Sequence, residues 1–445
     1  MKNKTIQLNI THIDIEDLFG IYTYSIPMDS TDISKLLILY GQNGAGKTTL
    51  LQIIFNLLSS ENRKGHKTEL ANTKFKTISI TLSNGYIIKA YRDNFIGNYN
   101  LYISENSNNL IDITCNTIIE NDKYIVRDGN EGHEKVQDFL NILKELNLSI
   151  HYLSDDRKIK TNLTMLLDEK KDNIEISNIP FDMLKEKKSF SINDAFLLMA
   201  INKVEKWFTR EVNLGNSIGQ NDIQEIYFNI IEDLLDDSKK EDSNNIITIN
   251  KEELLNKLKE LNIRNQEFMK YKLILDFNLD KYINLIEKTS TDKLKIIATT
   301  LNPYIDGIEK KLNAIEDTKK IINTFVTILN DFYTGKELSF SIDDGLKINS
   351  IYGKKECLKP TMLSSGEKQL LLLFCNTISA REEASIFIID EPELSLNVVW
   401  QRKLIDALLS FSEGSSIQFV LASHSIELLT QYNENVCVLE NIKKF

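Results

Sequence analysis

A glycine-rich segment near the start of the chain has the residue types that bind phosphate. Gly41–Thr48 reads as a glycine, four variable positions and then Gly-Lys-Thr, between an apolar run and an expected helix. The glycines let the backbone wrap around phosphate, with its N–H groups pointing inward at the helix N-terminus. Lys47 would reach the β- and γ-phosphates of ATP, and the Thr48 hydroxyl would bind Mg²⁺. The predicted nucleotide contacts are Gly41, Gln42, Asn43, Gly44, Ala45, Gly46, Lys47, Thr48 and Thr49.

Two adjacent carboxylates end an apolar run in the last part of the chain. Ile386–Ile389 is followed directly by Asp390 and Glu391. We expect Asp390 to hold Mg²⁺ through water and Glu391 to accept a proton from the attacking water. An acidic pair at a strand end can also be a solvated turn, but the phosphate-binding segment in the same chain favours the catalytic interpretation.

A third segment, Leu363–Glu367, has the pattern of a helix start. Ser364 is an N-cap candidate, and Glu367 completes a capping box with it. A helix N-terminus with serine hydroxyls and free N–H groups suits a γ-phosphate. An ordinary capped helix has the same pattern. The position of the segment shortly before the acidic pair favours nucleotide contacts by Ser364, Ser365, Gly366 and Glu367.

Buried strands are expected to position these residues. Leu36–Tyr40, Ile386–Ile389 and Ile417–Leu421 are continuous apolar runs, with an expected helix over Val398–Phe411. Apolar strands alternating with helices predict a parallel sheet covered on both faces. Asn84-Gly85 and Asp343–Gly345 each lie between alternating runs, which predicts two β-hairpins. The first hairpin belongs to an antiparallel ribbon that we expect to extend through Leu101–Ile113.

The middle of the chain is expected to be a helical insertion. Two shorter helical stripes, Ile223–Leu234 and Leu254–Leu261, flank a polar segment, Asp236–Asn245, that predicts an exposed loop. A longer stripe falls on heptad a and d positions at Ile305, Ile308, Leu312, Ile315, Ile322, Val326 and Leu329. Helix-on-helix core packing and a short coiled-coil arm both explain it. We predict that part of this stripe is left for another subunit.

These observations divide the chain into three parts. Residues 1–155 would be an N-terminal lobe with the phosphate-binding segment, residues 156–335 the helical insertion, and residues 336–445 a C-terminal lobe. The two lobes must come together in space to form one α/β domain, because the expected parallel strands are divided between them.

Composition excludes several classes of function. The net charge of −11 argues against a surface that coats DNA, and the basic stretches Arg63–Lys67 and Arg157–Lys160 are most simply solvated faces. The sequence has neither an apolar run long enough to span a membrane nor a signal peptide, so we expect a cytoplasmic protein with no membrane partner. The four cysteines are far apart in sequence, which predicts reduced residues and no zinc site.

The motifs together resemble those of ABC-type ATPases. Leu363–Glu367 resembles the ABC signature in the Ser-Ser-Gly-Glu form of SMC-like and defence ATPases, and Pro392–Asn397 resembles the D-loop. Ala422–Ser425 resembles the switch segment, which implies that His424 touches the γ-phosphate and orients the attacking water. The resemblance implies an ABC head split by a helical insertion, with each ATP between Lys47 of one subunit and Ser364 of another.

One element of the ABC pattern is missing. ABC proteins have a glutamine on a loop after the antiparallel region, where it contacts Mg²⁺ and links to the moving arm. The equivalent stretch here, His151–Arg157, has no glutamine, and Gln137 lies in an expected helix. The sequence therefore does not show how the ATP state reaches the insertion.

The long separation of Lys47 from Leu363 is unlike transporter subunits. The segments that together resemble those of compact bacterial antiphage ATPases are Ile13–Tyr24, Tyr40–Lys47, Leu363–Gln369 and Asp390–Leu396. Such ATPases include the OLD nucleases, the PtuA family of Septu and the AriA family of PARIS. OLD nucleases continue into a Toprim nuclease, whereas only Ser425–Phe445 follow His424 here, so we expect no second catalytic centre. The resemblance is therefore strongest to AriA, with PtuA second.

This resemblance implies an ATPase that forms at least a dimer, with higher assemblies expected. It would sense infection through a phage-encoded trigger and control a separate nuclease effector. The alternative is an SMC-like DNA-repair or chromosome-maintenance ATPase that acts directly on DNA, and DNA binding stays open.

Overall fold

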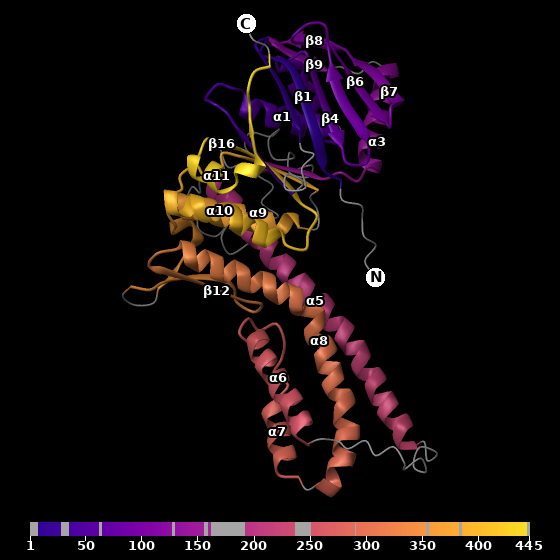
Figure 1. Ribbon diagram of the computed structural model, residues 1–445, viewed down its shortest axis with the longest axis vertical. Coiled ribbons are helices and arrows are strands. Elements are labelled where there is room, and N and C mark those ends of the chain that lie inside the picture. Colours follow the sequence, from indigo (N-terminus) through magenta and orange to yellow (C-terminus); the bar gives the residue numbers. More distant parts are fainter. Residues whose placement is uncertain are drawn as a thin grey trace. The chain divides into compact units, whose positions relative to one another are not determined.

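A computed structural model describes residues 8–27, 35–61, 65–126, 130–154, 159–161, 192–235, 251–289, 291–352, 356–381 and 385–442 (Figure 1). The expected loop Asp236–Asn245 and parts of both basic stretches lie outside these residues. The chain forms two compact units, one of Met1–Met199 with Leu372–Phe445 and the other of Ala200–Leu371. The division of the sequence at residues 155 and 335 stays a prediction.

The first unit contains a six-stranded sheet whose described strands are all parallel except one at the edge. Its order is β11 (Ile159–Thr161), β10 (Ile150–Leu153), β15 (Ile386–Asp390), β16 (Gln418–Ser423), β3 (Leu36–Tyr40) and β17 (Val436–Val438). Only β11 pairs antiparallel, with β10. Every residue of β15 and β16 is buried, as expected for parallel strands covered on both faces. The predicted parallel sheet is confirmed.

A second sheet in this unit is antiparallel throughout. Its order is β2 (Tyr22–Pro27), β1 (Ile10–Leu18), β4 (Thr77–Leu82), β5 (Tyr86–Tyr91), β6 (Tyr99–Glu105) and β7 (Asn108–Cys115). The predicted Asn-Gly hairpin is the β4–β5 connection, where Gly85 has a φ of +83° that favours glycine. Helix α1 (Lys47–Leu58) contacts strands of both sheets, and its apolar residues belong to one core with them.

The first unit also contains helices and a small hairpin outside these two sheets. Helix α2 (His66–Asn72) packs on a small hairpin, β8 (Thr117–Glu120) and β9 (Lys123–Val126), and α3 (Asn130–Glu145) packs on β7. Helix α10 (Val398–Ser412) connects β15 to β16 and contacts α11 (Ile426–Gln431), which the short turn Asn433–Asn435 follows. Helix α9 (Ser365–Ala380) begins in the second unit and ends in the first.

The second unit consists of long helices and a small sheet. Its helices are α6 (Lys251–Met269), α7 (Leu279–Glu287), α8 (Thr291–Phe332) and most of α5 (Ile192–Leu235), which begins in the first unit. The sheet contains β12 (Lys336–Ser341), β13 (Gly345–Ser350) and β14 (Cys357–Leu358), followed by the helical turn Pro360–Met362. The predicted hairpin at Asp343–Gly345 is confirmed as the β12–β13 connection. Helix α6 contacts α7 and α8, and α8 packs against β12.

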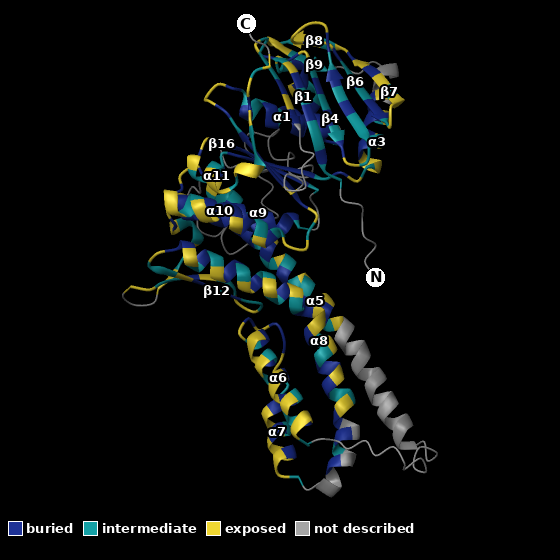
Figure 2. Cartoon of the chain, in the orientation of Figure 1, coloured by how far each residue is buried: buried dark blue, intermediate teal, exposed yellow. Residues whose placement is uncertain are grey.

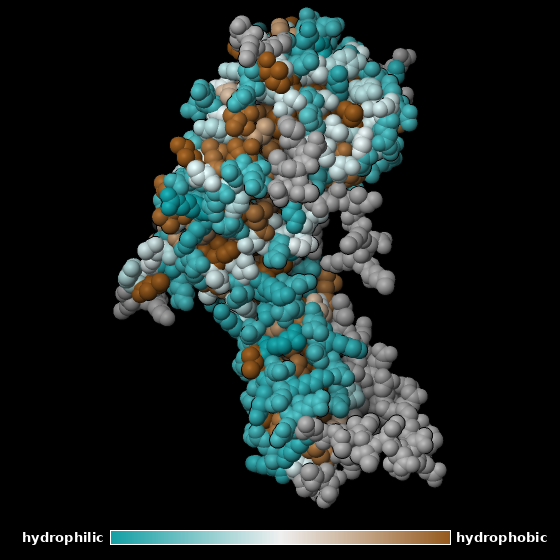
Figure 3. Space-filling model, viewed as in Figure 1, coloured by the Kyte–Doolittle hydropathy of each residue, from teal (hydrophilic) through white to brown (hydrophobic). Residues whose placement is uncertain are grey.

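The heptad stripe of the insertion is intramolecular core. Ile305, Ile308, Leu312, Ile315, Ile322, Val326 and Leu329 are all buried on α8, and Figure 2 shows buried residues recurring along this helix. Helix α5 approaches so closely that a Cβ on Gly215 would lie 2.1 Å from Cγ2 of Ile315. The visible face of α6–α8 is mostly hydrophilic (Figure 3). The prediction that part of the stripe is left for another subunit was therefore wrong, because neighbouring helices of the same chain cover it.

None of the helices in the described part of the chain is long and apolar enough to cross a membrane.

Removing a stripe residue should destabilise the chain rather than change its assembly. Leu312 is fully buried, so Leu312→Ala should lower the free energy of unfolding by about 2–5 kcal/mol. Ile263 on α6 is 64% exposed, and Ile263→Ala should change it by less than about 0.5 kcal/mol. Chemical denaturation followed by circular dichroism measures both. Equal stabilities of the two variants would contradict the core assignment.

Candidate functional site

The carboxyl ends of three neighbouring strands meet at one edge of the parallel sheet. Ser423 of β16 pairs with Tyr40 of β3, and Asp390 of β15 pairs with Ala422 of β16. The residues that follow these strand ends are the phosphate-binding segment, Glu391 and His424. Side chains that lie far apart in the sequence are therefore neighbours at this edge, the place where open α/β sheets bind their ligands.

The phosphate-binding loop has the backbone shape that the sequence predicts. Gly44 and Gly46 have φ values of +86° and +85°. A Cβ on Gly46 would lie 2.6 Å from the Leu18 side chain, so this position also requires close approach. Gly46 is the N-cap of α1 and offers no side-chain cap, which leaves the first N–H groups of the helix available to an anion.

Contacts from within the first unit hold this loop. The Lys47 ammonium is buried and donates to the Gly41 carbonyl oxygen at 2.8 Å. Burial raises the pKa of Tyr24 to about 12, with a further contribution from Tyr22, and its hydroxyl donates to the Ala45 carbonyl oxygen at 2.9 Å. Among the other predicted contacts, Gln42, Asn43 and Gly44 are exposed, and Thr48 and Thr49 are half-buried.

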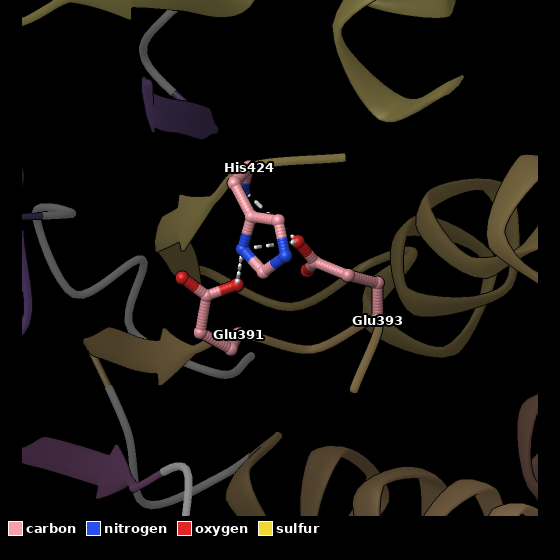
Figure 4. A group of neighbouring side chains, drawn as sticks. All are labelled: Glu391, Glu393 and His424. Atoms are coloured by element: carbon pink, nitrogen blue, oxygen red, sulfur yellow. Dashed lines mark hydrogen bonds and ion pairs between the residues drawn. The ribbon is translucent and has the colours of Figure 1, made fainter. Parts of the chain in front are cut away.

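The acidic pair and the histidine come together at the neighbouring strand ends. Asp390 is 2% exposed, and the Tyr152 hydroxyl lies 3.4 Å from its Oδ2. Glu391 has a φ of +49°, unusual for a non-glycine residue, and its N–H donates to the Ala422 carbonyl oxygen. Nδ1 of His424 lies 2.5 Å from Oε2 of Glu391 (Figure 4).

The electrostatics of Glu391 suit a proton acceptor. Burial raises the pKa of its carboxyl above the usual range, and the negative charges of Glu393 and Asp390 raise it further. The positive charge of Lys47 acts in the opposite direction without reversing the shift. A carboxylate with a raised pKa is a stronger base toward water than an exposed one.

Glu393 is a member of the site that the sequence did not identify. It is 4% exposed, and its Oε1 accepts hydrogen bonds from Oγ of Ser423 at 2.5 Å and from the His424 N–H at 3.0 Å. In the sequence it was only one residue of the D-loop motif. The sequence shows it only as a second carboxylate two positions after Glu391. Spacing alone does not distinguish such a site residue from an exposed acidic residue.

Two donor sets in this unit could bind a cation. Glu391, Glu393 and His424 offer ligand atoms within 4.8 Å of one another, but Oε1 of Glu393 already accepts hydrogen bonds. The predicted Mg²⁺ ligands, the Thr48 hydroxyl and the Asp390 carboxylate, are oxygen donors of the kind that Mg²⁺ prefers, with Thr48 in the first turn of α1 and Asp390 at the end of β15. The donor chemistry of this second set suits Mg²⁺, and its binding stays a prediction.

The region of the missing glutamine reaches the same sheet edge. Leu153 of β10 pairs with Ile389 of β15, so the buried Ser154 follows at the level of Asp390. Residues 155–158 lie outside the described residues. Gln137 lies on α3, where it donates to Oδ1 of Asn141 at 3.0 Å.

The predicted capping box of the signature segment is present in the second unit. The Ser364 N–H donates to Oε2 of Glu367 at 2.8 Å, and the Glu367 N–H donates to Oγ of Ser364 at 3.4 Å. Ser364 and Ser365 are exposed, whereas Gly366 and Glu367 are buried. The nucleotide contacts of these residues stay predictions, and the exposed serine hydroxyls are the groups best suited to them.

Glu367 also joins the signature helix to the end of α8. Its Oε1 lies 2.6 Å from Nζ of Lys336, and the Tyr333 hydroxyl donates to its carbonyl oxygen at 3.1 Å. Burial alone would raise the pKa of Glu367, but Lys336 and the hydrogen bonds from Ser364 outweigh burial and lower it. The carboxylate is therefore held charged inside the second unit.

Removing the Lys336 ammonium should leave the buried carboxylate of Glu367 without its partner. Lys336→Met should lower the free energy of unfolding by about 2 kcal/mol, less than the loss expected for a fully buried pair, since Lys336 is 23% exposed. The double variant Lys336→Met with Glu367→Gln, which removes both charges, should recover most of that loss. Thermal denaturation checks this, and a single variant as stable as the unchanged protein would rule the ion pair out as a structural link.

Comparisons with known proteins link the chain to ATPases. A family model described as AAA ATPase domain matches residues 10–429. The Retron Ec83 probable ATPase of Escherichia coli is 26% identical over 166 residues, which are 35% of this chain and 28% of that protein. The match thus spans well under half of the relative's length.

Two solved structures cover nearly all of the chain. The Smc head domain with an extended coiled coil, bound to the C-terminal domain of ScpA and derived from Pyrococcus furiosus, is 14% identical, with 98% of this chain and 94% of that chain covered and a TM-score of 0.40. The Smc head domain with a coiled coil and joint from Pyrococcus yayanosii is 14% identical, with 97% and 95% covered and a TM-score of 0.39. Both TM-scores are below 0.5, so the assignment of the fold rests on the sheet topology of this chain and not on these structures.

Proposed function

The chain belongs to the AAA ATPase domain family, and from this premise we propose that it hydrolyses ATP at the carboxyl edge of the parallel sheet. The backbone N–H groups around Gly44 and Gly46 and the ammonium of Lys47 would bind the phosphates. The Thr48 hydroxyl and the Asp390 carboxylate would hold Mg²⁺, which when bound neutralises charge on the phosphates.

The observation that carries this proposal is the contact between His424 and Glu391. Nδ1 of the histidine and Oε2 of the glutamate are 2.5 Å apart, next to the strand that leads into the phosphate-binding loop. This contact places the imidazole beside the carboxylate that would accept a proton from water. The imidazole would help to orient that water at the γ-phosphate, as the resemblance to ABC ATPases implies.

Composite sites between copies of the chain are part of the proposal. Ser364 and Ser365 are exposed at a helix N-terminus, where a γ-phosphate of another copy would accept hydrogen bonds. The D-loop and its surroundings expose apolar side chains, with Leu394, Val398, Val399 and Ile426 between 41% and 68% exposed. Exposed apolar groups of this kind favour association of at least two copies.

The biological role that we propose is control of a separate nuclease effector in antiviral defence, with a phage-encoded trigger. Its support is the resemblance of the motifs to those of the AriA and PtuA families and the partial likeness to the Retron Ec83 probable ATPase. Direct action on DNA is the second candidate, and the net charge of −11 gives it no support.

Mixed variants test the composite sites. Lys47→Ala and Ser364→Arg should each be nearly inactive, because each removes one half of every site. Co-expressed heteromers should regain part of the ATPase activity, since some sites then combine an intact Lys47 with an intact Ser364. The measurement is steady-state phosphate release from heteromers isolated with two affinity tags. Heteromers as inactive as the single variants would refute the composite arrangement.

Two substitutions separate binding from chemistry. Glu391→Gln keeps volume and phosphate contacts, so ATP should bind normally while hydrolysis falls about 10²–10⁴-fold. Lys47→Ala should weaken ATP binding itself. Calorimetry and phosphate release measure the two effects, and an equal loss of binding in both variants would contradict these roles.

The same Glu391→Gln variant tests the biological role. Protection of cells against phage should be lost with hydrolysis, and the unchanged protein should co-purify with a nuclease subunit. Hydrolysis that is stimulated by DNA, in a protein with no effect on phage growth, would favour the DNA-acting alternative.

A further inference from the structure

The carboxylate of Glu393 is buried at a position where a charged group is costly unless it is hydrogen-bonded. Its side chain is 4% exposed, and one oxygen, Oε1, accepts three hydrogen bonds. The donors are Oγ of Ser423 at 2.5 Å, the N–H of His424 at 3.0 Å and the N–H of Ser425 at 3.1 Å. All three belong to the switch segment that carries His424, so the carboxylate interacts with one short stretch of backbone.

A tight turn brings the side chains of Glu391 and Glu393 next to the same imidazole, that of His424. The Leu394 N–H donates to the Glu391 carbonyl oxygen, and the Leu396 N–H donates to the Glu393 carbonyl oxygen. Within this turn Glu391 and Ser395 have left-handed φ values of +49° and +68°. Both carboxylates approach Nδ1 of His424, Glu391 at 2.5 Å and Glu393 at 3.7 Å (Figure 4).

The switch segment is also held from α10. Oγ of Ser425 donates to Oε1 of Gln401 at 2.6 Å, and Nε2 of Gln401 donates to the Leu396 carbonyl oxygen at 3.0 Å. Hydrogen bonds therefore run from the turn through Gln401 to Ser425 and return through Glu393. These bonds couple the backbone of the turn to that of the switch segment through Oε1 of Glu393, while Oε2 of the same carboxylate is buried without a hydrogen-bond partner among the described residues.

We infer that Glu393 is a positioning residue for ATP hydrolysis, one that fixes the backbone of Ser423–Ser425 so that the imidazole of His424 stays on Glu391. The inference rests on the proposed function and adds to it a residue that would touch neither nucleotide nor attacking water. Glu393 acts through His424, so its effect on the rate requires the imidazole. A role in folding alone would have no such requirement.

A double-mutant cycle between Glu393 and His424 tests this dependence. Glu393→Ala should lower kcat about 10–100-fold, the scale expected when a catalytic group is displaced by about an ångström, with KM for ATP nearly unchanged. In the His424→Ala background the same substitution should lower kcat less than about two-fold. Glu393→Gln keeps an acceptor for the Ser423 and backbone donors and loses only the charge that raises the pKa of Glu391, so its kcat should fall much less than that of Glu393→Ala. Glu434→Ala, at an exposed acidic residue, is the control and should change nothing.

Several outcomes would overturn the inference. Equal losses of kcat from Glu393→Ala in both backgrounds would show that the residue acts independently of His424. A parallel loss of ATP binding would show a general structural role. If Glu393→Ala does not fold, Ser423→Ala replaces it, since it removes one donor to Oε1 and keeps the carboxylate, and the same dependence on His424 is expected.

Different results would refute the proposed function and the role of Glu393. If His424→Ala and Glu391→Gln both hydrolyse ATP normally in folded protein, the site itself is wrongly assigned. If both variants lower kcat strongly but measurably and the cycle is additive, only the role of Glu393 is refuted.

Discussion

The site depends on the parallel pairing of β15, β16 and β3 in one sheet. This register sets Asp390 beside Ala422 and Ser423 beside Tyr40, so that three chain segments leave the sheet at one edge. The strands are buried except at Tyr40, and burial of their apolar side chains holds the edge in place. The loop that would bind phosphate, the acidic pair and the histidine have their positions because these strands end together.

The second unit presents the signature helix in an equally defined way. Its capping box fixes the start of α9, and the same carboxylate, Glu367, is paired with Lys336 just after α8. The Tyr333 hydroxyl adds a bond to the Glu367 carbonyl oxygen. Hydrogen bonds therefore connect the end of the long helix α8 to the helix start that carries the exposed hydroxyls of Ser364 and Ser365. The glutamine expected from the ABC resemblance in His151–Arg157 is absent from the sequence.

Local chemistry made much of this predictable from the sequence. Asn84-Gly85, the Ser364–Glu367 box and the apolar run at Leu36–Tyr40 each specify their structure within a few residues, and each is present. The stripe on α8 could not be assigned in the same way, because periodicity shows that a face is buried but not which helix covers it. Glu393 was missed because its role arises from donors on another strand, which no local pattern contains.

The most direct test of this account is a structure of the Glu391→Gln variant with ATP and Mg²⁺. Nζ of Lys47 donates to the Gly41 carbonyl oxygen at 2.8 Å. The account predicts that the ammonium turns to the β- and γ-phosphates, that Thr48 and Asp390 lie around Mg²⁺, and that His424 faces the γ-phosphate. ATP bound elsewhere, or phosphates that contact neither Lys47 nor the N-terminus of α1, would contradict it.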